Sequence, residues 1–249
     1  KMNPYDLYAL ERMGNADEAL GGTMSRGMFL TMAFGCGGAE DYDAADIQAI
    51  LEYAQALPDE EDHSSETANM ASGTQIYSFQ TIGGAGGLFG AAEDFGCSLE
   101  DLQVCGLPFR EGSGTLVPVV YLAIPASSKN VDAAFGFIKS LMLEENTLYK
   151  NLELNAFPIL SAEYERLAEY EQQRIDAAEE GQYPWTYAKH YERAAEVLDG
   201  LNGLCCPDTA LMGIVDDAVP AYFAGASDAS KTADEIVSRL GIYFAEKGN

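Results

Sequence analysis

The clearest hydrophobic pattern in this chain lies between residues 131 and 142. Apolar side chains recur there at i, i+3, i+4, i+7, i+10 and i+11, which places them in one stripe along an α-helix. Ser128 or Asn130 is the candidate N-cap, because a short side-chain oxygen accepts a hydrogen bond from an otherwise unpaired amide. The pattern therefore predicts a helix with this apolar stripe: Val131, Ala134, Phe135, Ile138, Leu141 and Met142.

Two further helices are predicted from their first turns. Asp43 is a candidate N-cap with Asp46 at the N3 position, and an apolar face follows until Pro58. Near the C-terminus, Thr232 and Glu235 have the spacing of a capping box that opens the last helix. The two expected buried faces are Ile47, Ile50, Leu51 and Ala54 in the first helix, and Ile236, Val237, Leu240, Tyr243 and Phe244 in the second.

Short apolar segments between the helices are typical of strands. They are TQIYSF at 74–79, LQVCGLP at 102–108 and VVYLAIP at 119–125, and a glycine-rich turn at 83–90 leads from the first of them into a helix. After Pro158 the pattern is helical, with Pro220 expected to kink or interrupt one helix. This order of elements predicts an α/β protein with a mixed sheet flanked by helices.

Charge narrows the range of partners. The 249 residues allow one large domain or two small ones, and 14 basic against 40 acidic side chains give a net charge of −26. So acidic a chain repels nucleic-acid phosphates and anionic lipid, which excludes nucleic acid as a partner. The acidity is explained by a solvated anionic surface, with a cationic ligand as the alternative.

Metal, cofactor and catalytic signatures are incomplete. The five cysteines have no C-x-x-C spacing, so a zinc ribbon or thioredoxin motif has no support. The acidic cluster at 41–46 has no glycine at the sixth position of a calcium loop, and helix capping explains it more simply. Residues 84–90 depart from G-x-G-x-x-G, although a helix start there would offer amides to a ligand. Gly112-Ser113-Gly114 lacks the full nucleophile-elbow pattern. We therefore expect no enzyme, no cofactor and no metal site.

A family resemblance comes from residues 105–139, CGLPFREGSGTLVPVVYLAIPASSKNVDAAFGFIK. This segment resembles the pattern G-x-P, a-I-x-a-x-S-K-N and A-A-x-x-F-I-K of extracellular solute-binding proteins of ABC importers, in the sugar-binding, maltose-binding-protein-like branch. Further segments resemble the same family in the same order: LEYAQALPDEED, ASGTQIYSF, NAFPILSAEYE and AYFAGASDASKTADEIVSRLGIYFAE. Together the matches span roughly residues 40–249.

The resemblance implies a type II periplasmic-binding-protein-like fold, in which two α/β lobes joined by hinge strands hold a ligand between them. This chain would be the C-terminal portion, with the first lobe largely missing. Residues 1–103 and the helical part 160–249 would form the C-terminal lobe, and residues 104–159 the return excursion towards the missing lobe. The apolar stripe around Phe135 and Ile138 would then be exposed or covered by a neighbouring chain.

Matched position by position, the resemblance places two short segments at the ligand cleft. One is the turn Gln80, Thr81 and Ile82, and the other is the helix start with Asp208, Thr209 and Met212. Ile82 and Met212 stand where the family's sugar binders often have tryptophan, and Tyr121 is a candidate substitute for stacking on a sugar. The alternatives are helix capping by Asp208, solvent exposure of Gln80 and core packing by Met212.

These features predict a non-enzymatic protein that captures a small polar solute, a carbohydrate by the resemblance, and delivers it to the membrane subunits of an ABC permease. The resemblance implies an extracellular protein, lipid-anchored at the cell surface when full length or else periplasmic, and a monomer when full length. The alternative is a surface sensor or interaction domain that keeps the solute-binding fold without transport.

Overall fold

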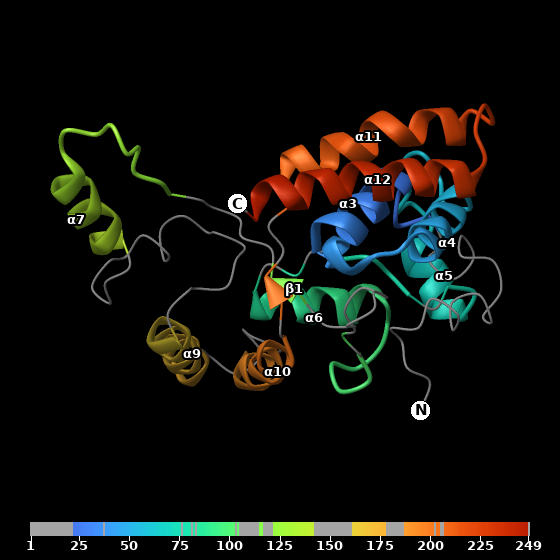
Figure 1. Cartoon of the computed structure of the whole chain (residues 1–249). Helices are drawn as coiled ribbons and strands as arrows, with labels where there is room; N and C mark the ends of the chain where they lie inside the picture. The colour runs from blue at the N-terminus through green and yellow to red at the C-terminus, as the bar shows by residue number, and fades with distance from the viewer. Residues whose placement is uncertain are drawn as a thin grey trace. The chain divides into compact units, whose positions relative to one another are not determined.

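The structure is a computed structural model of the whole chain, and it describes residues 22–36, 38–75, 77–80, 82, 84–102, 104, 115–116, 122–141, 161–177, 187–201, 203–204 and 207–248. This part is helical (Figure 1). Its helices are α3 (Arg26–Cys36), the 3-10 helix η1 (Ala39–Asp41), α4 (Ala44–Gln55), α5 (Glu66–Ser72), α6 (Ala85–Asp94), α7 (Val131–Leu141), α9 (Ser161–Asp176), α10 (Tyr187–Asp199), α11 (Thr209–Phe223) and α12 (Ala229–Lys247). No described helix has the length and apolarity that a membrane span requires.

The predicted mixed sheet is wrong. The described residues contain two strands of two residues each, β1 (Thr115–Leu116) and β2 (Gly203–Leu204), which pair in parallel. The described parts of 74–79, 102–108 and 119–125, where we expected strands, form no ladder. Around residue 79 the backbone is held by side chains instead: the amide of Phe79 donates to Oγ1 of Thr23 at 3.2 Å. β propensity is realised only where a neighbouring strand is present to pair with.

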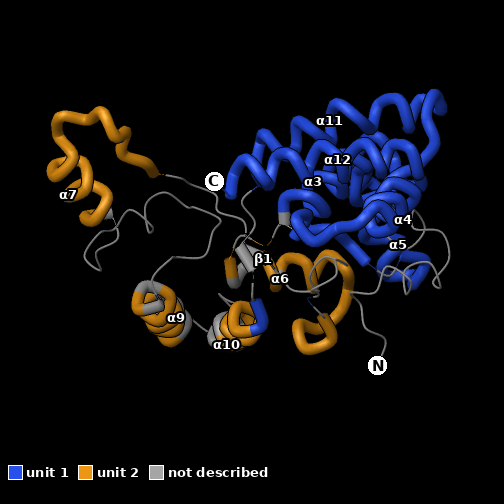
Figure 2. Tube along the Cα trace, in the orientation of Figure 1, with its two compact units in different colours: residues 1–80, 103–117, 200–249 blue, residues 81–102, 118–199 orange. Residues whose placement is uncertain are grey.

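The chain divides into two compact units (Figure 2). The first contains residues 1–80, 103–117 and 200–249, and the second contains residues 81–102 and 118–199. The lobe boundaries that we expected at residues 103 and 159 stay a prediction.

The first unit has the principal apolar core, formed by α3, α4, α11 and α12. The capping box predicted for α4 is confirmed, because Asp43 accepts from the amide of Asp46 while the Asp46 side chain accepts from the amide of Asp43. The predicted apolar face is confirmed as well, since its four members are all buried. The largest fully buried side chains of this core are Phe29, Phe34, Ile47, Leu51, Leu57, Val215 and Ile236.

The last two helices differ from the prediction at specific residues. α12 begins at Ala229 with Asp228 as its N-cap, one turn before the predicted capping box at Thr232. Asp228 is the stronger cap, and Thr232 is instead buried, with its hydroxyl donating to the carbonyl of Asp228 at 3.0 Å. Pro220 does not end α11, which continues to Phe223.

In the second unit, α6 and α10 pack around the buried side chains of Leu88 and Ala194. The predicted helix at 131–142 is confirmed by α7, Val131–Leu141. Val131 and Phe135 of its apolar stripe are exposed, the latter to 60%, whereas Ala134 and Ile138 are half-buried. Exposure around Phe135 is one of the two outcomes expected above.

Candidate functional site

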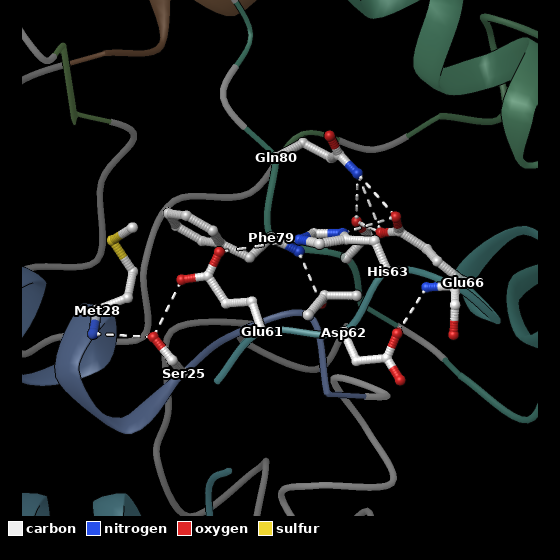
Figure 3. A network of polar contacts seen from close by, with 11 residues as sticks. Ser25, Met28, Glu61, Asp62, His63, Glu66, Phe79 and Gln80 are labelled. Atoms are coloured by element: carbon white, nitrogen blue, oxygen red, sulfur yellow. Dashed lines mark hydrogen bonds and ion pairs between the residues drawn. The ribbon is translucent and has the colours of Figure 1, made fainter. Parts of the chain in front are cut away.

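A network of polar contacts in the first unit surrounds Glu66, the first residue of α5 (Figure 3). The residue is only 8% exposed, so its carboxylate needs internal hydrogen-bond donors. Its position in the first turn of a helix also favours a negative charge, because unpaired amides gather there. The site is therefore organised by one nearly buried carboxylate.

Three side chains supply polar contacts to this carboxylate. The Gln80 amide nitrogen donates to Oε1 at 3.0 Å and to Oε2 at 3.1 Å, and the Ser78 hydroxyl donates to Oε1. Nδ1 of His63 lies 3.0 Å from Oε2. Ser78 and Gln80 are two residues apart, and their side chains lie on the same side, because the Gln80 amide nitrogen also donates to the Ser78 hydroxyl oxygen at 3.0 Å.

The loop before α5 brings a second carboxylate to the same histidine. Nε2 of His63 lies 3.9 Å from Oε2 of Glu61, and the Ser25 hydroxyl donates to Oε1 of Glu61 at 3.0 Å. The loop is fixed by its own turn, because the amide of Ser64 donates to the Asp62 carboxylate at 2.8 Å. His63 thus lies between two acidic side chains, in a loop whose course is set by local hydrogen bonds.

The orientation of Gln80 gives the site an outward-facing group. Its amide nitrogen is directed to Glu66, and Figure 3 shows its amide oxygen pointing away from the carboxylate. Gln80 is exposed, so this oxygen is an oriented acceptor for a hydroxyl or amine of a ligand. The Ser78 hydroxyl is directed to the Glu66 carboxylate. The described residues contain no group of three or more His, Cys, Asp and Glu side chains suited to a metal ion. The arrangement is suited to binding.

Of the first predicted segment, Gln80 is part of this site. Ile82 packs against the small core around Leu88 in the second unit. Thr81 lies outside the described residues, and so does Tyr121.

The second predicted segment has well-defined partners of its own. The Asp208 carboxylate caps α11 by accepting from the amides of Ala210 and Leu211. It also accepts from the Tyr243 hydroxyl, and Nζ of Lys247 donates to it at 2.7 Å. The hydrogen bonds from Lys247 and Tyr243 hold the pKa of Asp208 well below its ordinary value of 3.8. Asp208 has a capping role here, and a ligand at this carboxylate would compete with Lys247.

Thr209 and Met212 lie on the same helix. Thr209 is the first residue of α11 and is exposed, whereas Met212 is half-buried against the principal core. The packing of Met212 agrees with the core-filling alternative that we left open above. Among the described residues, Gln80 and Asp208 form hydrogen bonds with different side chains. The two predicted residues therefore belong to two separate polar clusters.

Sequence reasoning missed the residues that organise the site. Glu66 is one of 40 acidic residues, and nothing in its immediate sequence marks it as buried. The available signal was the Ser78 and Gln80 pair at i, i+2, which places two polar side chains on one face of the segment expected to lead into the cleft. His63 lies in the polar loop before α5, and no motif in the sequence singles it out.

Comparison with known proteins gives no relative. No family model, curated protein or solved structure matches this chain.

Proposed function

We propose that this chain is a non-enzymatic binding protein that captures a small polar solute outside the cell, a carbohydrate in the first instance, for delivery to an ABC permease. The proposal is supported by the order of the family-like segments between residues 40 and 249. The resemblance also implied α/β lobes with a mixed sheet, and the helical described residues do not support that part of it. In this proposal the ligand is held by hydrogen bonds and no covalent chemistry takes place.

The observation that carries the proposal is the outward-facing amide oxygen of Gln80. This residue was placed at the ligand site from the sequence, and its nitrogen is already paired with a nearly buried carboxylate. An acceptor that is held in place loses little side-chain entropy when a ligand hydroxyl donates to it. Polar groups fixed in this way give orientation and specificity to sites for small polyhydroxylated ligands.

A thermal-shift screen followed by calorimetric titration tests the proposal. The probes are oligosaccharides, polyols, amino acids and polyamines, each added to the full chain. We expect an oligosaccharide or polyol to raise the melting temperature, because a ligand that binds only the folded state stabilises it. Gln80→Ala should then weaken that binding about three- to tenfold, since one neutral hydrogen bond contributes about 0.5–1.5 kcal/mol.

Gln48→Ala is the matched control for this experiment. Gln48 is also a glutamine whose amide nitrogen donates to a glutamate, Oε1 of Glu52 at 2.7 Å, but it lies on α4 outside the site. Binding should be unchanged in this variant. If the two variants bind the ligand with equal affinity, Gln80 has no role in binding. If only polyamines raise the melting temperature, the ligand is cationic and not a carbohydrate.

The alternative, a surface interaction domain without transport, is favoured by one observation. Large apolar side chains of the second unit are open to solvent, including Phe137, which is 62% exposed. Such patches commonly mark interaction surfaces.

A further inference from the structure

Helix α7 exposes apolar side chains that a folded helix normally covers. Val131 and Phe135 are both exposed, and they lie one turn apart with Ile138 on the same face. Val131 and Phe135 therefore present an apolar face of the helix to solvent.

Two charges of opposite sign flank this face. Asp132 and Lys139 lie at i and i+7, on the same side of the helix and on either side of Phe135 along it. Two turns separate them, which is too far for an ion pair with each other. Neither charge has an ion-pair partner in the part of the chain that the structure describes.

This arrangement is complementary to a second copy of itself in the antiparallel direction. In such a pair the N-terminal half of one helix lies beside the C-terminal half of the other. Asp132 of each copy then meets Lys139 of the other, while the two Phe135 rings lie near the symmetry axis. A purely acidic partner helix would place a negative charge against Asp132. A purely basic one would place a positive charge against Lys139.

We infer that α7 is a self-association surface, through which two copies of this chain form an antiparallel helix pair. The high net charge of −26 opposes association in general. Locally the charge is different, because residues 122–141 contain two lysines and one aspartate. One helix of 11 residues buries less than a standard interface, so the dimer is weak and reversible. This inference does not depend on the proposed solute binding.

Sedimentation velocity of the full chain over an approximately 100-fold range of concentration tests the inference. The average mass should rise with concentration towards that of a dimer. Phe135→Ser should weaken the association about 100-fold, because a central aromatic side chain contributes most to a small interface. Phe137→Ser is the matched control, since Phe137 is equally exposed on α7 but points to the opposite side, and it should leave the association unchanged.

A charge exchange identifies the geometry. In the dimer, residue 132 of each copy faces residue 139 of the other. Asp132→Lys or Lys139→Asp alone therefore places like charges together at both contacts and should weaken association about tenfold. The double variant, with both exchanges, should restore it. A chain that remains monomeric at all concentrations would overturn the inference. So would equal effects of the two phenylalanine variants, or a double variant that associates no better than the single ones.

Discussion

The guanidinium group of Arg26 lies 4.4 Å from the ring centre of Phe223, and so connects the start of α3 to the end of α11. The same group also binds backbone carbonyls near the end of α4. Its Nε and Nη2 donate to the carbonyls of Ala54 and Leu57, each at 3.2 Å. Nη1 lies 2.6 Å from the carboxylate of Asp59. One planar cation thus binds two backbone carbonyls at and just beyond the end of α4, a carboxylate and an aromatic face.

Arg26→Lys should therefore lower the free energy of unfolding by about 1–3 kcal/mol, because a lysine ammonium cannot reproduce the fork of donors or the stacked geometry. Urea unfolding checks this. Arg239→Lys is the control, since Arg239 pairs with Asp217 and Glu235 on a more exposed surface. Its effect should remain below about 1 kcal/mol. Equal losses in the two variants would show that the Arg26 contacts have no special weight.

Asp208 and Lys247 give a prediction for pH dependence. The bond from Lys247 lowers the pKa of Asp208 in the folded state, so the unfolded state takes up the proton first as the pH falls. The stabilisation is complete well above the ordinary aspartate pKa of 3.8 and decreases as the pH falls below it. Asp208→Asn keeps a capping side chain and removes the charge. We expect it to be less stable than the wild type at neutral pH, with a difference that shrinks at acidic pH.

Unfolding curves at several pH values measure that difference. Asp216→Asn, at an exposed position on the same helix, is the control and should differ little in stability from the wild type. If the Asp208→Asn difference is constant from neutral to acidic pH, the ion pair with Lys247 is not its source.

Two glycines test how closely the helices pack. A methyl group at Gly35 of α3 would lie 3.0 Å from Cβ and 3.2 Å from Cα of Pro207, whereas at Gly241 of α12 it would contact nothing within 4 Å. Gly35→Ala should destabilise the protein by about 1–3 kcal/mol, because a rigid proline must move. Gly241→Ala should stabilise it by about 0.5–1 kcal/mol through helix propensity alone. Thermal unfolding of both variants measures these changes in stability. If both substitutions stabilise the protein, the contact with Pro207 is easily relieved.

Local signals in this sequence predicted helices well. The cap at Asp43 with its apolar face located α4, because capping and helical periodicity both depend on residues within one turn of each other. The α12 start was misplaced by one turn because both Asp228 and Thr232 are acceptable caps, and burial of Thr232 decided between them.

Strands were predicted poorly because they depend on residues that are distant in the sequence. A strand requires a partner from elsewhere in the chain, and a segment such as 74–79 has the composition without showing where that partner is. The same limit applied to the site. The family resemblance suggested Gln80 as a ligand residue, but its hydrogen-bond partner Glu66 lies fourteen residues earlier and is recognisable only when burial is known.

The last prediction concerns the carboxylate at the centre of the site. Glu66→Ala leaves the donors Ser78 and Gln80 without their acceptor, so it should lower the free energy of unfolding by about 1–3 kcal/mol. It should also loosen the segment that carries these donors, and hydrogen exchange at the amide of Phe79 should become faster, although that amide bonds to Thr23 and not to Glu66. Glu60→Ala, at an exposed position in the preceding loop, is the control and should change neither quantity. Unchanged exchange at Phe79 in Glu66→Ala would mean that the carboxylate does not hold the segment in place, and the oriented oxygen of Gln80 would then need another explanation.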